Sequence, residues 1–232
     1  MSNMSVNVAG VEWKNPVTVG SGTFGSGMEY SEFVDLNRLG AVVTKGVANV
    51  PWPGNPTPRV AEVYGGMLNA IGLQNPGIDV FIERDLAFLK QFDTRIVVNV
   101  CGHSLDEYLD VVKRLADEPI DMMEINISCP NVKEGGIAFG TDPKGVETIT
   151  SEIKKYAKQP VIMKLSPNVT SIAEIARAAE AGGADAVSLI NTITGMKIDI
   201  NRRSFVLANK TGGMSGPAVH PVAVRMVYET AH

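Results

Sequence analysis

The chain has 232 residues, of which 44% are hydrophobic and 20% are charged, and its formal net charge is -4. This is the balance of a globular protein with a sizeable core, and it excludes the basic surface that binds nucleic acid or an anionic membrane. The length suits one large α/β domain or two small ones.

Two further classes of protein are excluded by sequence pattern. No apolar run approaches the ~20 residues that cross a bilayer, and residues 1–10 lack the basic and apolar regions of a signal peptide. Cys101 and Cys129 form neither a disulfide framework nor a zinc motif, and the histidines make no ligand pattern. We therefore expect a cytoplasmic protein with no metal, no nucleic-acid partner and no membrane partner.

The first predicted elements are strands. Met4–Val8 and Val11–Trp13, joined by Ala9-Gly10, are predicted to form a hairpin. Buried strands are then predicted at short, continuous apolar runs rich in β-branched residues, as in a parallel sheet covered on both faces. These runs are Val17–Gly22, Val42–Val47, Ile96–Cys101, Met122–Ser128, Pro160–Ser166 and Ala186–Thr192. The Pro-rich run Pro51–Pro58 is interpreted as a structured loop.

Amphipathic helical patterns lie between the later strands. Ser104–Ala116 places its apolar residues on one face and begins with a capping box. Asp142-Pro143 is predicted to open the next helix, and a second capping box at Ser171 opens a helix that Gly182-Gly183 ends. The last helical pattern runs from Pro221 to Ala231.

Repeated βα units predict a parallel sheet, either an open doubly wound sheet or a closed barrel. The barrel is favoured because polar residues follow nearly every predicted strand, whereas an open sheet would gather them at one switch point. We therefore predict a single domain over residues 1–232, a TIM (β/α)8 barrel whose bottom the hairpin closes. Since the runs account for only part of about eight strands, we expect the last two βα units to be missing from this chain.

A cysteine and two lysines stand at predicted strand ends. Cys129 precedes Pro130 and a Gly-rich loop at the face where barrels place catalytic residues, although a buried, inert cysteine fits as well. Lys45 and Lys164 lie in apolar strands, where an unpaired ammonium is costly. They predict an anionic ligand or, alternatively, an ion pair with a strand carboxylate such as Glu124.

Asparagines recur at the same rim. An amide offers donors and an acceptor, so several of them suit a flat ligand that alternates N–H and C=O groups, while any one alone is more often a turn residue. They are Asn69, Asn75, Asn99, Asn126, Asn131 and Asn191. The Gly-rich segments Gly20–Gly25 and Thr211–Pro217 lack a Rossmann fingerprint and suit either close approach to a flat cofactor or plain loops.

Four motifs, taken together, resemble the class 1 dihydroorotate dehydrogenases. They are Asn69–Gly77, Asn126–Asn131, Lys164–Asn168 and Ile190-Asn191-Thr192. Gly72–Pro76 and Gly136–Gly140 resemble the B type, in which a catalytic subunit passes electrons to NAD through a partner subunit. The resemblance runs from about Val6 to Tyr228, and the combination of motifs is specific.

The resemblance implies a TIM barrel that holds FMN at its top and oxidises dihydroorotate to orotate in pyrimidine biosynthesis. Cys129 would be the base that removes the C5 proton while a hydride leaves C6 for the flavin. FMN contacts would come from Ser21, Lys45, Gly46, Asn99, Asn126, Lys164, Ile190 and Gly216. Dihydroorotate or orotate would contact Lys45, Asn69, Ala70, Ile71, Gly72, Leu73, Asn126, Asn131, Asn191 and Thr192.

The resemblance also implies partners and leaves alternatives open. It implies a homodimer joined by an electron-transfer subunit that carries FAD and an iron-sulfur cluster. The family's FMN-phosphate loops follow strands seven and eight, for which we find no counterpart here. One competing interpretation is a dihydrouracil-type flavin dehydrogenase domain, although that family has His where this chain has Asn131. The other is a non-catalytic truncated remnant with exposed strand edges.

Overall fold

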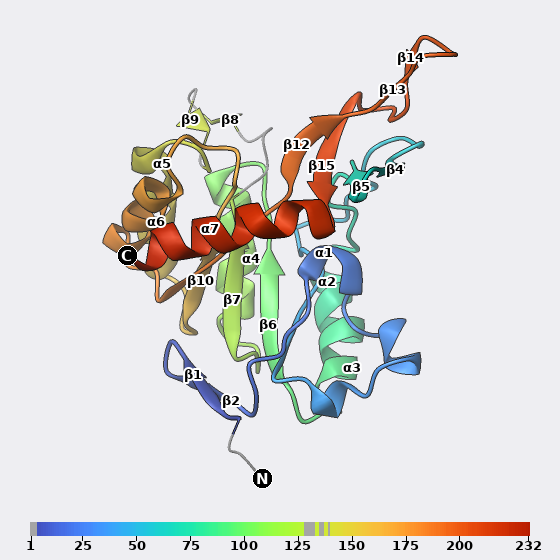
Figure 1. Ribbon diagram of the computed structural model, residues 1–232. Helices are drawn as coiled ribbons and strands as arrows, with labels where there is room; N and C mark the ends of the chain where they lie inside the picture. Colours follow the sequence, from blue (N-terminus) through green and yellow to red (C-terminus); the bar gives the residue numbers. More distant parts are fainter. Residues whose placement is uncertain (1–3, 128–132, 135–136, 139) are drawn as a thin grey trace.

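The computed structural model describes residues 4–127, 133–134, 137–138 and 140–232. Its centre is a five-stranded parallel sheet in the order β11-β10-β7-β6-β3 (Figure 1). The strands are β3 (Ala41–Val43), β6 (Arg95–Val100), β7 (Met122–Asn126), β10 (Val161–Lys164) and β11 (Ala186–Ser188). Each strand lies beside the one that precedes it in this series, without the reversal of a doubly wound sheet. The predicted barrel class is confirmed, because these strands form part of a TIM barrel.

One predicted strand, Val17–Gly22, is wrong. Residues 17–20 are extended but belong to no strand, and α1 (Ser21–Phe24) is a short helix. The segment is tied to the sheet where Val17 O accepts hydrogen bonds from Gly40 N (2.9 Å) and Ala41 N (3.4 Å). Val17 is 51% exposed, so the apolar run does not reflect burial. The other five predicted runs each contain a strand, which ends before the last residue of the predicted run.

Helices cover one face of the parallel sheet. The main ones are α4 (Leu105–Leu115), α5 (Pro143–Lys154), α6 (Ile172–Ala181) and α7 (His220–Ala231), with a continuous helical segment of α2 (Ile78–Val80), η3 (Phe81–Leu86) and α3 (Ala87–Leu89). Short turns are η1 (Tyr30–Glu32), η2 (Leu36–Arg38) and η4 (Pro217–Val219). None of the helices in the described ranges is long and apolar enough to span a membrane.

The predicted helix caps are confirmed. Ser104 Oγ accepts a hydrogen bond from Glu107 N (3.3 Å), and Ser171 Oγ accepts one from Glu174 N (3.3 Å). Asp142 caps α5 by accepting from Gly145 N (2.8 Å), with Pro143 in the first turn. Each cap satisfies backbone donors that have no partner within the helix, which fixes where the helix begins.

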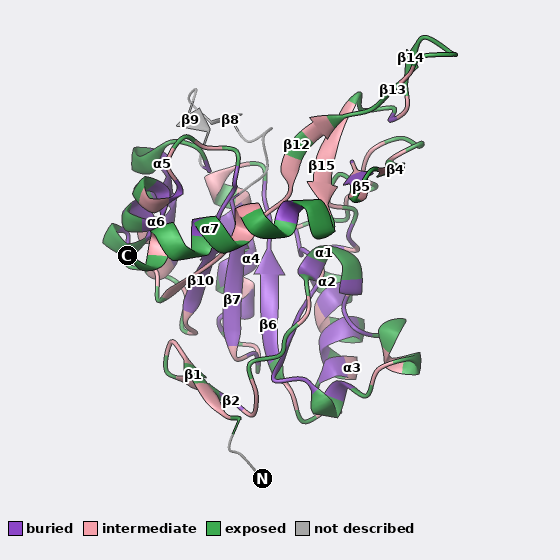
Figure 2. Cartoon of the chain, in the orientation of Figure 1, coloured by how far each residue is buried: buried purple, intermediate pink, exposed green. Residues whose placement is uncertain are grey.

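Two hydrophobic clusters pack on the parallel sheet, one on each face, and a third, around Leu68 and Leu207, belongs to the second sheet described below. The larger lies between the sheet and its helices, and β6 and β7 are buried along almost their whole length (Figure 2). The smaller lies at the amino ends of the strands, where Trp13 packs with Val43, Val97, Met122 and Ile162. Trp13 belongs to the hairpin of β1 (Val6–Val8) and β2 (Val11–Trp13). The predicted hairpin therefore exists, and it closes the bottom of the sheet.

A second sheet, which the sequence did not predict, lies beyond the carboxyl ends of the parallel strands (Figure 1). Its antiparallel order is β12-β15-β5-β4. Its strands are β4 (Val60–Val63), β5 (Gly66–Asn69), β12 (Ile193–Met196) and β15 (Thr211–Ser215). Two further pairs of strands stand apart from it. They are β8 (Lys133–Glu134) with β9 (Ile137–Ala138), and β13 (Ile198–Asp199) with β14 (Ser204–Phe205). The Gly-rich segment Thr211–Pro217 is thus mainly a strand.

Candidate active site

The polar residues of the central strands lie on one face of the sheet, opposite the helices. Side chains alternate along a strand, so Glu124 and Asn126 of β7 point to the face that the apolar Met123 and Ile125 avoid. The register sets Asn99 of β6 opposite Glu124, and Lys164 of β10 opposite Asn126. These strands are hydrophobic over most of their length, but toward their carboxyl ends one face of the sheet carries polar side chains.

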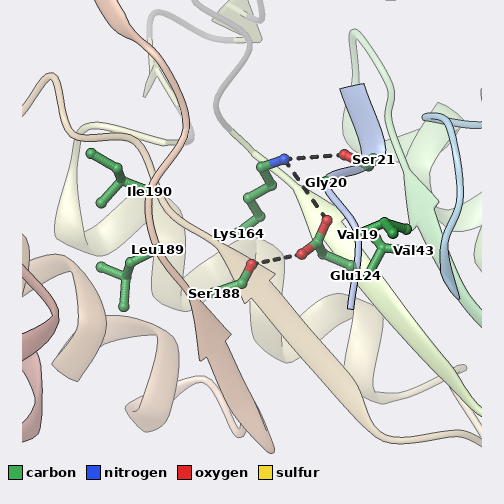
Figure 3. A pocket seen from close by; sticks show the side chains of 9 residues that line it. All are labelled: Val19, Gly20, Ser21, Val43, Glu124, Lys164, Ser188, Leu189 and Ile190. Carbon is green, nitrogen blue, oxygen red and sulfur yellow. Dashed lines mark hydrogen bonds and ion pairs between the residues drawn. The ribbon is translucent and has the colours of Figure 1, made fainter. Parts of the chain in front are cut away.

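A cavity of about 170 Å³ opens on this face. Figure 3 shows Lys164, Ser21 and Glu124 pointing toward one another across it, with Ser188 beside Glu124. The lining residues are Val19, Gly20, Ser21, Val43, Glu124, Lys164, Ser188, Leu189 and Ile190. The predicted site residues Ser21, Lys164 and Ile190 are thereby brought together from three distant parts of the chain.

Glu124 lies at the centre of a buried polar network. Its Oε1 accepts a hydrogen bond from Asn99 Nδ2 (2.6 Å), and its Oε2 accepts one from Ser188 Oγ (2.8 Å). The Lys164 ammonium lies 3.9 Å from Oε1 and donates to Ser21 Oγ (3.1 Å). The alternative prediction, an ion pair between a strand lysine and Glu124, is thus present as a long contact, while Lys164 also faces the cavity.

Lys45 and Gly46 follow β3 at the same rim. In the described part of the chain, no hydrogen bond or ion pair involves Lys45 Nζ, and burial lowers the pKa of this ammonium below its usual value of 10.5. Gly46 leaves room beside Asn99, since a Cβ at Gly46 would lie 3.1 Å from Asn99 Oδ1. That oxygen is buried and accepts no hydrogen bond from the residues described here. The rim therefore holds a cation at Lys45 and, beside Gly46, a buried acceptor that has no donor among the described residues.

A second group of amides extends the rim. Asn191 Nδ2 donates to Asn126 Oδ1 (3.2 Å), and Asn191 Oδ1 accepts from Thr192 N (2.8 Å). The buried hydroxyl of Tyr108, on α4, donates to Asn126 O (2.7 Å) and anchors the end of β7. Asn168 continues this group, because its Nδ2 donates to Thr192 O (3.1 Å).

The loop after β5 reaches the same region through the antiparallel sheet. Asn69 Nδ2 donates to Gly213 O (3.3 Å), and a Cβ at Gly213 would lie 1.9 Å from Thr192 Oγ1. Further along, Ala70 O and Ile71 O accept hydrogen bonds from Asn55, and Gly72 and Leu73 have positive φ values of 74° and 52°. The predicted substrate segment Asn69–Leu73 is therefore a fixed loop beside Thr192.

Some predicted rim residues lie elsewhere. Asn75 uses its side chain to hold its own loop, where Oδ1 accepts from Gly77 N (2.9 Å), so the turn interpretation fits it. The same loop pairs with Trp52, which confirms that Pro51–Pro58 is structured. Gly216 packs against Gly65 and Gly66 at the end of β15 rather than among the cavity residues. Cys129 and Asn131 lie outside the described residues.

Ser188 and the central role of Glu124 were not predicted. The signal was present in the alternation, because Glu124 precedes Asn126 by two positions and therefore shares its face. On β11, Ser188 likewise follows Ala186 by two positions and therefore shares its face. Cys101, the last residue of the predicted buried strand Ile96–Cys101, is fully buried.

Known proteins resemble the chain over nearly its whole length. The family model described as dihydroorotate dehydrogenase matches residues 3–232. A "Dihydroorotate dehydrogenase B (NAD(+)), catalytic subunit" of Lachnoclostridium phytofermentans is 74% identical over 230 residues, which cover 99% of this chain and 77% of that protein. The protein of the same description from Alkaliphilus metalliredigens is 64% identical over 99% of this chain and 76% of its own length.

A solved structure shares the fold. The crystal structure of DHODH from Eimeria tenella in complex with ferulenol matches 98% of this chain and 69% of that one, with a TM-score of 0.75 and 20% sequence identity. At this identity the match concerns the fold alone.

Proposed function

The chain belongs to the dihydroorotate dehydrogenase family of oxidoreductases, and we propose that it is the catalytic subunit of a B-type enzyme that oxidises dihydroorotate to orotate with FMN. The high identity to relatives described as NAD-linked catalytic subunits supports this type. Orotate formation is a step of pyrimidine biosynthesis. The observation that carries the proposal is the pair of rim lysines, Lys45 and Lys164, together with the buried Oδ1 of Asn99, which has no donor among the described residues.

The residues present fit a flavin. Asn99 Oδ1 is a buried acceptor without a donor among the described residues, which is costly unless a ligand N–H reaches it. Gly20 and Gly46 allow a flat group to approach the backbone closely. When bound, FMN supplies the hydride acceptor. Its proposed contacts are Ser21, Lys45, Gly46, Asn99, Asn126, Lys164 and Ile190, and Gly216 would contact it from the end of β15.

The rest of the rim would hold the substrate. Dihydroorotate carries amide edges and one carboxylate, so the amides Asn69, Asn126 and Asn191 would read its edges while Lys45 pairs with its charge. Thr192 and the loop Ala70–Leu73 would close the other side, with Asn131 as a further contact. These residues orient the C5–C6 bond and keep water from it.

Cys129 is proposed as the base that takes the C5 proton. In the sequence it follows Asn126, the last residue of β7, by three positions, and TIM-barrel enzymes take their catalytic groups from the segments that follow the strands. A thiol, with an ordinary pKa of ~8.5, needs only modest help to act as a base near neutral pH.

Electrons would leave through a partner. The relatives are described as catalytic subunits, which supports a second, electron-transfer subunit. We propose that this partner carries FAD and an iron-sulfur cluster and reduces NAD, and that the catalytic chain forms a homodimer.

An anaerobic titration tests the function. We expect the FMN-reconstituted protein to lose its flavin absorbance with dihydroorotate but not with dihydrouracil, because only the former has a carboxylate for Lys45. Orotate, but not uracil, is expected to perturb the oxidised flavin spectrum. Reduction by dihydrouracil would favour the dihydrouracil-type activity, and a protein that takes up no FMN would contradict the proposal.

A further inference from the structure

Glu124 is a buried carboxylate to which the proposed reaction gives no part. It is 6% exposed, in the middle of β7, and both of its oxygens are engaged (Figure 3). Asn99 Nδ2 lies 2.6 Å from Oε1 and Ser188 Oγ lies 2.8 Å from Oε2. The Lys164 ammonium is 3.9 Å away. A charged group of this kind is costly to bury, so its surroundings are informative.

The carboxylate determines which way the Asn99 amide points. An ionised carboxylate only accepts hydrogen bonds, so the amide of Asn99 must turn its NH2 group toward Glu124. Its Oδ1 then faces the other way, toward Gly46, where it is buried and has no donor among the described residues. Without Glu124, either end of the amide could face the site.

The same carboxylate holds the Lys164 ammonium. Lys164 Nζ lies between Ser21 Oγ (3.1 Å) and Glu124 Oε1 (3.9 Å), at the wall of the cavity. A flexible lysine side chain carries considerable rotamer entropy, and an opposite charge beside it restricts where the ammonium lies. One buried group therefore orders both an acceptor and a cation.

We propose that Glu124 is a positioning residue that fixes the amide direction of Asn99 and the place of the Lys164 ammonium. The site then holds a buried acceptor on the side of Gly46 and, at the cavity wall, a cation for a planar ligand whose edge alternates N–H and C=O groups. In the proposed function, on which this inference rests, that ligand is the flavin ring. Ser188 supports the arrangement by occupying the second carboxylate oxygen.

The test is FMN affinity in Glu124→Gln. A glutamine amide donates as well as accepts, so Asn99 can turn its oxygen toward it and its NH2 group toward Gly46, and Lys164 loses its opposite charge. We expect the FMN dissociation constant, from fluorescence quenching on titration into apoprotein, to rise roughly tenfold to a hundredfold. Asp85→Asn is the matched control, because Asp85 is also buried but pairs with Arg84 on a helix; its FMN affinity is expected to stay unchanged.

A double-mutant cycle separates positioning from general damage to the fold. In an Asn99→Leu background there is no amide to orient, so Glu124→Gln is expected to weaken FMN less than it does in the wild type. If Glu124→Gln does not fold, Glu124→Asp, which keeps the charge but shortens the reach, takes its place with a smaller expected loss. Full additivity, or unchanged affinity in the variant that folds, overturns the role of Glu124 alone. A wild-type protein that binds no FMN overturns the proposed function as well.

Discussion

Lys45 combines burial with a position at the ligand rim. Burial lowers its pKa most, Lys164 and Arg59 lower it further, and only Cys101 opposes them. A lysine of this kind binds an anion only while it keeps its proton. Because the folded pKa lies below 10.5, that proton is lost at a lower pH than in an ordinary lysine.

Orotate affinity is therefore expected to fall as the pH rises toward the usual lysine pKa of about 10, and the fall is expected to begin below that value. The measurement is the orotate dissociation constant, from the perturbed flavin spectrum, across the alkaline range. Lys45→Arg stays charged, so its affinity is expected to change less with pH. Parallel profiles for the two proteins would show that Lys45 does not carry the pH dependence.

Cys129→Ser tests the proposed base. A serine hydroxyl is a far weaker base at neutral pH, so we expect reduction of the flavin by dihydroorotate to slow by roughly 10²–10⁴, with partial recovery at high pH. Orotate binding is expected to stay nearly intact. Stopped-flow measurement of the reductive half-reaction gives the rate, with Cys101→Ala as the control that removes the other thiol. An unchanged rate would remove Cys129 from the mechanism.

Lys164→Ala tests the charge at the cavity wall. Reduced flavin gains negative charge, which a nearby ammonium stabilises, so the variant is expected to have a lower flavin midpoint potential and weaker FMN binding. Redox titration measures the potential, and Lys158→Ala, at an exposed ion pair with Asp117, is the control. If the potential does not move, Lys164 is only the structural partner of Glu124.

For individual residues, the sequence indicated which types of side chain the site contains better than it indicated which side chains contact one another. Lys45, Lys164 and the asparagines stood out because polar side chains in apolar strands are costly. The ion pair of Glu124 with a strand lysine was predicted as an alternative, but its hydrogen bonds to Asn99 and Ser188 were not, since these partners lie 25 and 64 residues away and meet it only through strand register. Pairing of that kind depends on the whole sheet and not on local pattern.

Among the elements, those that depend on local signals were predicted best. Ser104, Asp142 and Ser171 cap the helices that follow them, because a cap requires only the next few residues. The strand predicted at Val17–Gly22 was wrong because β-branched residues also suit an extended segment that belongs to no sheet. Strand β15 was missed because Thr211–Ser215 is rich in glycine, and its partners β5 and β12 determine its conformation.

Gly213→Ala tests how tightly the antiparallel sheet is joined to the rim. The new Cβ would lie 1.9 Å from Thr192 Oγ1, so Thr192 or the strand must shift. We expect a loss of roughly 1–3 kcal/mol in the free energy of unfolding and weaker orotate binding. Urea denaturation provides the first and spectral titration the second. Gly22→Ala, where a Cβ meets nothing within 4 Å, is the control, and equal effects of the two changes would contradict this account.

In the whole molecule, the amino ends of the parallel strands pack against the hairpin, whereas their carboxyl ends form the candidate site. The hairpin core around Trp13 lies mainly toward the amino ends of the strands, and it meets the cavity at Val43, which belongs to that core and also lines the cavity. The barrel class was predictable because each βα unit repeats the same pattern. How the antiparallel sheet lies over the rim was not, because it joins segments that no local pattern connects.

Trp13→Ala is expected to lower the free energy of unfolding by about 3–5 kcal/mol, since it empties a buried site at the base of the sheet. That is a large part of the stability of an ordinary domain. Phe33→Ala, at a side chain 81% exposed, is expected to change little. Urea denaturation measures both, and the FMN affinity of the remaining folded Trp13→Ala protein is expected to match the wild type. A selective loss of FMN affinity would show that the two ends of the sheet are coupled.

The pairing of β5 with β15 has a consequence for the order in which the protein folds. The parallel strands pair with their neighbours in the series, so that sheet can grow as the chain emerges during synthesis. By contrast, Asn69 can form its hydrogen bond only after Gly213, 144 positions later in the chain, has been synthesised. Closing so long a loop has an entropic cost before any contact repays it. We therefore expect the barrel strands to form first and the loop that borders the ligand rim to reach its place only near the end of folding.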